Sequence, residues 1–335
     1  MRTHGATSGA AAPAPGPAFL SDRRVARAYF ALQAAVGTLW WVGVATVPAV
    51  RSATLGALNP IPIFWLDLPL FVFASAAAAL GFRAGAWIAA PWAALVALGM
   101  AGYATVTGLA GWGALLMIAA AVGSTGAAIL LITGRIPAEL VIRGPFRFRI
   151  AAPASPRAHR RRTAQQVAVF WLVFLALIPA AISLIEHRWG LALDSPVWLR
   201  GAGLLLFAGA GVAGIWAAAT MSTRGRGTPL PAAMPAELVI AGPYRIVRNP
   251  MAVSSLAQGA AVGLMLGSWL IVAYAIAGGL VWNFLIRPQE EADLEARFGA
   301  AFAAYRERVR CWLPRVPRGG APSAAAEARG GRARR

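Results

Sequence analysis

The stretch AGPYRIVRNPMAV, residues 241–253, is a polar, arginine-bearing segment set between two long apolar runs. Pro243 and Pro250 break any helix between them, because proline lacks a backbone N–H and clashes with the preceding turn. Pro250 also begins the next apolar run, and proline is favoured in the first turn of a helix. We therefore expect a loop that ends at the N-terminus of an apolar helix.

Composition places this loop in a membrane protein. The chain has 335 residues, of which 59% are hydrophobic and 13% charged, whereas a soluble domain carries about 25% charged residues. Apolar residues gather in runs close to the roughly 20 residues that cross a bilayer. These runs are 26–48, 62–81, 85–107, 112–133, 166–186, 199–221, 251–268 and 270–287. We expect an all-α integral membrane protein with about eight transmembrane helices, the last two forming a tight hairpin.

Arginine placement predicts the orientation of these helices. If all eight runs span, the arginine-rich connections 134–165 and 222–250 and the tail after 287 fall on one side. By the positive-inside rule that side is cytoplasmic, and so are both termini. The connection 186–196 on the opposite side is nearly neutral, and only Arg51 is misplaced on that side, where an arginine near a helix end can snorkel. The lysine-free, alanine-rich composition is typical of a GC-rich bacterial genome and so indicates a bacterial cytoplasmic membrane.

Other features argue against nucleic-acid and metal binding. The net charge of +19 could suggest a nucleic-acid partner, but all 31 basic residues are arginine, which fits codon bias better than a phosphate-reading surface. The single cysteine, Cys311, permits no intramolecular disulfide. The three histidines lie far apart, so no Cys/His ligand spacing exists and we expect no metal site.

The order of these features divides the chain into five segments. We expect disordered basic tails at 1–24 and 316–335, a four-helix membrane region of unknown role at 25–134, a basic cytoplasmic linker at 135–165 and a second membrane domain at 166–315. PAELVIRGPFR at 137–147 also matches PAELVIAGPYR at 235–245 at nine of eleven positions. Duplication of a helix-plus-loop unit and convergence in a biased composition both remain open.

Arg248 and Asn249 stand at the mouth of the helix that Pro250 begins. Free backbone N–H groups and the positive end of the helix dipole gather there. With Arg245 and Arg248 as cationic donors, a carboxylate or phosphate would bind well. The alternative is that the arginines contact lipid headgroups and Asn249 caps the helix.

A second candidate element follows the hairpin. Residues 287–314 read RPQEEADLEARFGAAFAAYRERVRCWLP, and apolar residues three or four apart predict an amphipathic cytoplasmic helix after Pro288. Glu290 and Glu291 stand in its first turn. They either complement the helix dipole or, facing the arginine-bearing loop, help to hold a zwitterionic ligand.

In order and spacing, these motifs resemble the isoprenylcysteine carboxyl methyltransferase and phospholipid methyltransferase family over about residues 166–315. The family pattern is Gly-x-Tyr-x-x-x-Arg-His-Pro-x-Tyr, a hairpin, then Glu-Glu, Phe-Gly, Tyr and a terminal Pro. The matching residues are Gly242, Tyr244, Arg248, Pro250, Glu290, Glu291, Phe298, Gly299, Tyr305 and Pro314. The chain departs from the pattern at Asn249, where the family has His, and at Ala252, where it has Tyr.

The resemblance implies an integral membrane enzyme that uses S-adenosylmethionine, with a lipid-like acceptor that enters from the bilayer. It assigns catalysis to Arg248 and Asn249. It assigns cofactor binding to Gly242, Tyr244, Arg245, Arg248, Asn249, Pro250, Glu290 and Glu291. A carboxylate acceptor suits a site without a histidine base, because it is already ionised near pH 7. The alternatives are an NADPH-dependent reductase of the steroid-reductase type and a non-catalytic membrane protein whose site has decayed at Asn249 and Ala252.

Asp67 is the other candidate functional residue. An acid inside an apolar run is a functional candidate by default. It lies only five residues inside its run, so the alternative is that its side chain reaches the membrane interface.

Overall fold

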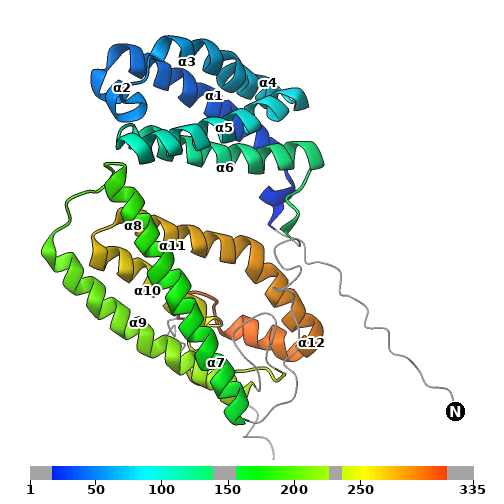
Figure 1. Cartoon of the computed structure of the whole chain (residues 1–335). Coiled ribbons are helices and arrows are strands. Elements are labelled where there is room, and N and C mark those ends of the chain that lie inside the picture. Colours follow the sequence, from blue (N-terminus) through cyan, green and yellow to red (C-terminus); the bar gives the residue numbers. More distant parts are fainter. Residues whose placement is uncertain (1–16, 139–155, 226–235, 315–335) are drawn as a thin grey trace, which may run out of the picture.

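The computed structural model describes residues 17–138, 156–225 and 236–314, and these residues form helices and loops without strands (Figure 1). The N-terminal half contains η1 (Ala18–Ser21), α1 (Arg23–Thr46), α2 (Pro48–Leu55), α3 (Pro60–Asp67), η2 (Leu68–Phe73), α4 (Ala74–Leu80), α5 (Arg83–Thr107) and α6 (Gly111–Thr133). The C-terminal half contains α7 (Pro156–Phe170), η5 (Trp171–Leu177), α8 (Ile178–Arg188), α9 (Val197–Arg224), η7 (Gly242–Arg245), α10 (Pro250–Leu266), α11 (Trp269–Val281), η8 (Trp282–Ile286) and α12 (Arg287–Arg308). The segments η2, η5 and η8 are π-helical turns within longer helices.

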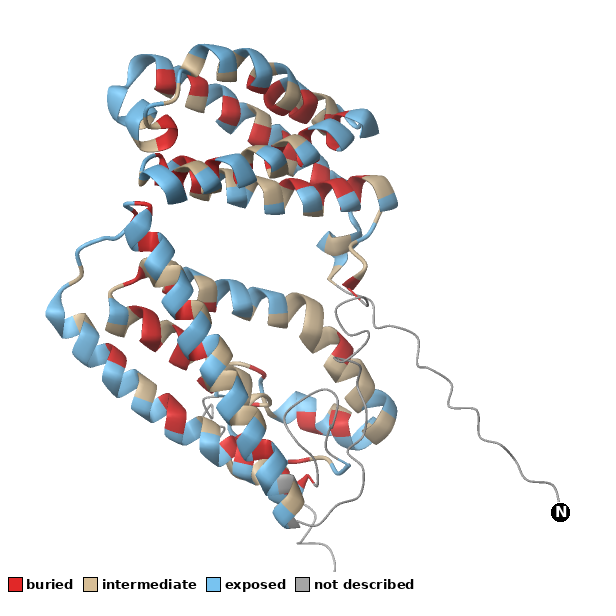
Figure 2. Cartoon of the chain, viewed as in Figure 1, coloured by how far each residue is buried: buried red, intermediate tan, exposed pale blue. Residues whose placement is uncertain are grey.

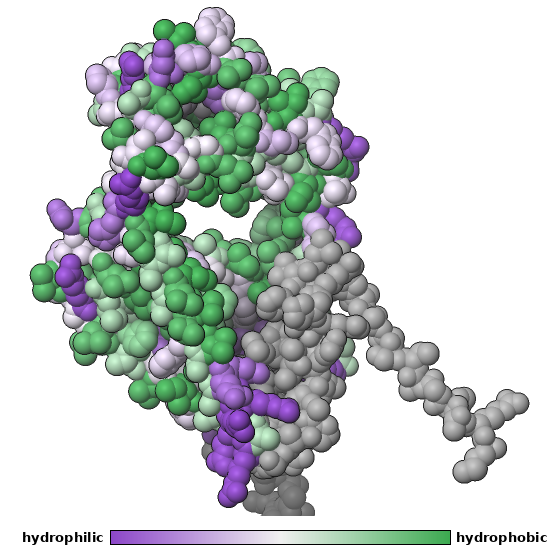
Figure 3. Space-filling view, in the orientation of Figure 1, coloured by the Kyte–Doolittle hydropathy of each residue, from purple (hydrophilic) through white to green (hydrophobic). Residues whose placement is uncertain are grey.

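The predicted all-α membrane architecture is confirmed. Within the described residues, seven continuous helical stretches are long and apolar enough to cross a membrane, and the remaining predicted run is α10, a helix of 17 residues. Large apolar side chains such as Leu205 and Val106 are 77% and 78% exposed. Figures 2 and 3 show that such exposed, hydrophobic surface covers both halves, as a lipid-facing protein requires.

The last two helices form the expected hairpin. Gly267 ends α10 in a left-handed conformation with φ +67°, and the Ser268 hydroxyl caps α11 by accepting the Ile271 N–H. A close approach of α9 to α10 positions this hairpin: a Cβ on Gly203 would stand 2.9 Å from the Ala261 carbonyl oxygen. Small residues permit such contacts between membrane helices.

The amphipathic helix is not a separate element. Helices α11, η8 and α12 run continuously from Trp269 to Arg308, and π-helical η8 lies directly before the turn that contains Pro288. Charged residues begin at Arg287, so we take Trp269–Ile286 as the spanning part and α12 as lying outside the membrane. At Gly299, φ is +49° and α12 turns back on itself.

The two halves meet at both ends of their helices. At one end Arg188 donates to the carbonyl oxygens of Thr105 and Val106, the first at 2.7 Å, and Trp112 stacks on Trp269. At the other end Phe19 packs edge-on against Phe284. Between these contacts an opening passes through the molecule (Figure 3).

The orientation predicted from arginine placement can be tested along α9. We expect a cysteine at Asp194, before α9, to react with a membrane-impermeant maleimide in intact cells, and a cysteine at Arg224 to react only after permeabilisation. Both positions are exposed. The background is Cys311→Ala, because Cys311 is the only native cysteine. If intact cells label the Arg224→Cys variant and not the Asp194→Cys variant, the orientation is the opposite of the predicted one.

Candidate functional site

The loop before α10 is fixed by its own sequence. Gly242 has φ +55°, and a Cβ there would stand 2.9 Å from Thr220 Oγ1, so both the backbone conformation and the space favour glycine. Tyr244 is buried and belongs to a small core cluster with Ala217 of α9 and Val239. Asn249 Oδ1 accepts the Ala252 N–H at 3.0 Å, and Pro250 occupies the first turn of α10. Asn249 thus caps the helix, as one of the two interpretations expected.

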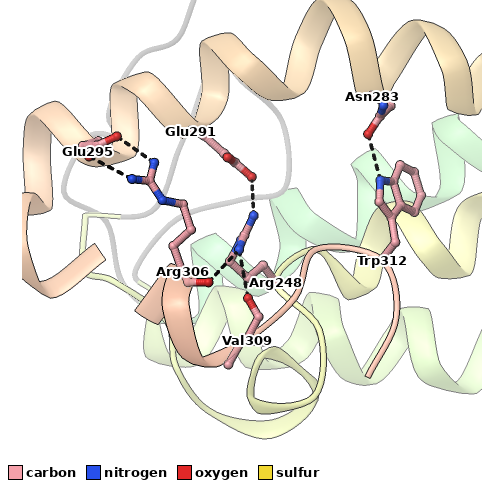
Figure 4. Close-up of polar contacts among 7 residues, drawn as sticks. All are labelled: Arg248, Asn283, Glu291, Glu295, Arg306, Val309 and Trp312. Carbon is pink, nitrogen blue, oxygen red and sulfur yellow. Dashed lines mark hydrogen bonds and ion pairs between the residues drawn. The ribbon is translucent and has the colours of Figure 1, made fainter. Parts of the chain in front are cut away.

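Arg248 joins this loop to the end of α12 (Figure 4). Its Nη2 donates to Glu291 Oε1 at 2.7 Å, and its Nη1 donates to the carbonyl oxygens of Arg306 and Val309 at 3.1 and 2.9 Å. Its backbone N–H donates to the Arg310 carbonyl oxygen. The side chains of Arg248 and Glu291 are only 13% and 22% exposed, so water screens this ion pair poorly. The Arg248 Nε atom is buried without a partner.

The two adjacent glutamates differ sharply in their surroundings. Glu291 has Arg248 as its counter-charge, whereas no described residue forms a hydrogen bond or ion pair with Glu290. Burial raises the pKa of Glu290 to about 7, and the negative charges of Glu291 and Asp293 add to the rise. Glu290 is therefore a half-buried carboxyl group that lacks a cationic partner within the described part of the chain.

A second bond closes the cluster around Arg248. The Tyr305 hydroxyl, on the returning part of α12, donates to the Tyr244 carbonyl oxygen at 2.6 Å. Burial raises the pKa of both tyrosines, and the charge of Glu290 adds to the rise at Tyr244. Both phenols are thus neutral at physiological pH, and Glu290 lies near Tyr244.

An apolar groove runs along the hairpin of α10 and α11. It has a volume of about 480 Å³ and is lined mainly by Leu256, Ala260, Ile276 and Leu280 of α10 and α11. Trp312 and Asn283 also line it, and Trp312 Nε1 donates to Asn283 Oδ1 at 2.8 Å (Figure 4). The groove is therefore apolar along the hairpin and polar where Asn283 and Trp312 line it.

The structure brings most of the predicted site residues together where the start of α10 meets the first turns of α12. Arg245 is exposed and makes no polar contact with any described residue. The first copy of the repeat lies outside the described residues from position 139 onward. The residues that gather are Gly242, Tyr244, Arg248, Asn249, Pro250, Glu290 and Glu291.

Sequence reasoning did not predict the Asn283–Trp312 contact. Twenty-nine residues separate the two positions, and no periodicity links an amide inside an apolar run to a tryptophan after the last helix. The proximity of Trp312 to Pro314, a residue of the family pattern, was the one available signal. Among the described residues no group of three His, Cys, Asp or Glu side chains could hold a metal ion.

Part of the chain is similar to known proteins. Residues 198–301, from the start of α9 into α12, match the model of the phospholipid methyltransferase family. No curated protein sequence matches the chain. A solved structure of the eukaryotic intramembrane Ras methyltransferase ICMT (isoprenylcysteine carboxyl methyltransferase) aligns at 16% identity over 88% of this chain and 98% of that chain, with a TM-score of 0.33. The match at residues 198–301 thus confirms the resemblance to phospholipid methyltransferases over that stretch.

Proposed function

We propose that the protein is a membrane methyltransferase that uses S-adenosylmethionine and methylates a lipid-like or hydrophobic acceptor, with a carboxylate as the preferred acceptor group. The observation that carries the proposal is Glu290. A half-buried carboxyl group beside Glu291 and Asp293, with no cationic partner in residues 17–138, 156–225 and 236–314, is suited to a ligand that brings positive charge. S-adenosylmethionine brings an ammonium and a sulfonium group, so the residues present fit it.

When bound, S-adenosylmethionine supplies an electrophilic methyl group. The protein's own part is to bind, align and exclude water, which methyl transfer needs more than acid–base groups. Glu290 supplies the negative charge for the cofactor's cationic groups. Arg248 Nη1 and Nη2 and Asn249 Oδ1 all form hydrogen bonds within the protein, so we propose that both are positioning residues. Arg248 holds α12 on the loop, and Asn249 fixes the start of α10.

In this proposal the acceptor binds in the groove between α10 and α11. Its apolar lining suits a hydrocarbon chain that enters from the bilayer, and its polar end lies at Asn283 and Trp312. An ionised carboxylate delivered there needs no base. This agrees with the described residues of the cluster, which include no histidine.

The test is methyl transfer itself. Purified full-length protein is incubated with S-adenosylmethionine labelled in its methyl group and a total membrane lipid extract, and any labelled product is identified. We expect label in an apolar product that releases methanol on mild alkali, as a methyl ester does and a methylated amine does not.

Two further measurements separate the alternatives. Binding of NADPH without binding of S-adenosylmethionine would indicate the reductase. Binding of neither would indicate a non-catalytic membrane protein.

A further inference from the structure

The N-terminal half encloses a cavity of its own, remote from the cluster around Arg248. It has a volume of about 590 Å³, within the roughly 300–1,000 Å³ typical of small-molecule sites. Its lining is largely apolar, from α1, α5, α6 and the α3–η2 segment. The exposed side chains of Leu32, Val36 and Leu66 belong to the lining, so the cavity opens on the lipid-facing surface.

Most polar groups of this cavity are satisfied by one another. Gln33, which is buried, donates to Ser75 Oγ at 2.9 Å and accepts hydrogen bonds from Tyr29 and Ser124 at 2.7 and 2.8 Å. Trp40 Nε1 donates to Thr54 Oγ1 at 3.1 Å. These neutral groups leave no donor or acceptor that needs a ligand.

Asp67 is the exception. Its side chain does not reach the interface: it is 6% exposed and lies at the end of α3, about 10 Å along the helix from Pro60 at 1.5 Å per residue. Oδ1 accepts the Trp92 N–H and Oδ2 accepts the Trp41 N–H, both at 2.9 Å. Both oxygens thus act as acceptors, as those of a carboxylate do.

An ionised Asp67 would lack a counter-charge among the described residues. Its two hydrogen-bond partners are neutral, and no described arginine forms an ion pair with it. A charged side chain at this depth in a membrane is costly unless it is paired. The aromatic rings of Trp40 and Trp92 also line the cavity, and aromatic faces attract cations.

We propose that this cavity binds an amphiphile with a cationic ammonium head, which sits against Asp67 and the tryptophan rings while its hydrocarbon chain extends to the opening at Leu32, Val36 and Leu66. The ammonium balances the buried carboxylate, and the apolar lining accommodates the chain. The site is separate from the proposed methyl-transfer site, so it stands whether or not that proposal holds.

The glycines of α5 offer a matched pair of variants. Gly99 lines the cavity and Gly102 does not, and a Cβ on either residue would meet nothing within 4 Å. A leucine side chain at position 99 therefore narrows the cavity. A leucine side chain at position 102 lies on the same helix but outside the cavity lining, so Gly102→Leu is the control. Both variants are expected to fold. Asp67→Asn removes the charge at nearly constant size.

The experiment uses the full-length protein in an uncharged maltoside detergent. The probe is an alkyltrimethylammonium with a photoreactive diazirine in its chain, compared with its neutral analogue in which carbon replaces the nitrogen. We expect saturable labelling of α1 and α5, with half-saturation at an ammonium concentration at least about tenfold below that of the neutral analogue. Asp67→Asn should abolish this preference. Gly99→Leu should reduce labelling by both probes, and Gly102→Leu should leave it unchanged.

Two results would overturn the proposal. Equal half-saturation for the two probes in the unmodified protein would show that the cavity takes hydrocarbon chains without regard to charge. Equal labelling of the Gly99→Leu and Gly102→Leu variants would show that the ammonium probe binds elsewhere. If Asp67→Asn fails to fold, these two comparisons still decide.

Discussion

Replacing Glu290 with glutamine is expected to weaken binding of S-adenosylmethionine by about 10–150-fold at pH 8, the effect of losing one charged hydrogen bond of about 1.5–3 kcal/mol. The carboxyl group has no cationic partner among the residues that the structure describes, so its charge is available to the ligand. Isothermal titration calorimetry of the full-length protein measures the change. The matched control is Glu295→Gln on the same helix, where the exposed carboxylate pairs with Arg306.

The same residue predicts a pH dependence. The pKa of Glu290 is about 7, so the ionised form that binds a cation is lost as the pH falls through 7. Wild-type affinity should therefore drop between pH 8 and pH 6, approaching tenfold per pH unit below the pKa. Glu290→Gln should remove this part of the dependence.

Stability should change in the opposite sense. A raised pKa means that the folded state holds the proton more tightly than the unfolded chain does, where the carboxyl group titrates near 4.5. Without ligand, the folded state loses stability as the pH rises from about 4.5 to about 7. Glu290→Gln should thus raise Tm at pH 8 while it weakens binding. Unchanged affinity together with the higher Tm would mean that Glu290 is no part of a cofactor site.

Arg248→Lys is expected to lower methyl transfer by at least about tenfold, equivalent to roughly 1.4 kcal/mol. The guanidinium bonds Glu291 and two carbonyl oxygens through separate nitrogens. An ammonium is a single point of charge and cannot reproduce that planar set of contacts. Because the ion pair is poorly exposed, we also expect a loss of unfolding free energy of about 1.5–3 kcal/mol.

The chain supplies a control for this substitution. Arg306 and Glu295 form an ion pair at 2.8 Å, nearly the same length as the pair of Arg248 and Glu291, but their side chains are 41% and 47% exposed. Exposed pairs are worth about 0–1 kcal/mol, so Arg306→Lys should change activity and stability little. Equal losses for the two variants, in turnover and in thermal unfolding, would show that Arg248 has no special role in holding the loop on α12.

Local sequence rules predicted the helices and their ends well. Each apolar run became a helix because its residues can satisfy their backbone groups only within the segment. Asn249 and Pro250 mark the start of α10 through interactions within three residues. The continuity of α11 with α12 was not predicted, because Pro288 suggested a helix break. In the structure π-helical η8 directly precedes the turn that contains Pro288, and the helix continues.

Contacts between distant segments were predicted less completely. The resemblance named both Arg248 and Glu291, but not that they pair with each other across 43 residues. Glu290 and Glu291 are adjacent in the sequence, but their different surroundings depend on contacts with distant segments and so were not predicted. Asp67 stood out as an acid in an apolar run, whereas its partners Trp41 and Trp92 come from α1 and α5 and become neighbours only in the folded bundle.

The opening between the two halves makes surrounding lipid part of the architecture. Helices α6 and α11 border it (Figures 1 and 3), and both keep large exposed apolar side chains, among them Val122 and Ile276. Water cannot favourably fill such a space within a bilayer, so acyl chains must occupy it. Acyl-chain length and order are then expected to act on the spacing of the halves, which the described residues join at their ends. Membrane fluidity is thereby expected to act on this protein from the space between its halves as well as from the surrounding bilayer.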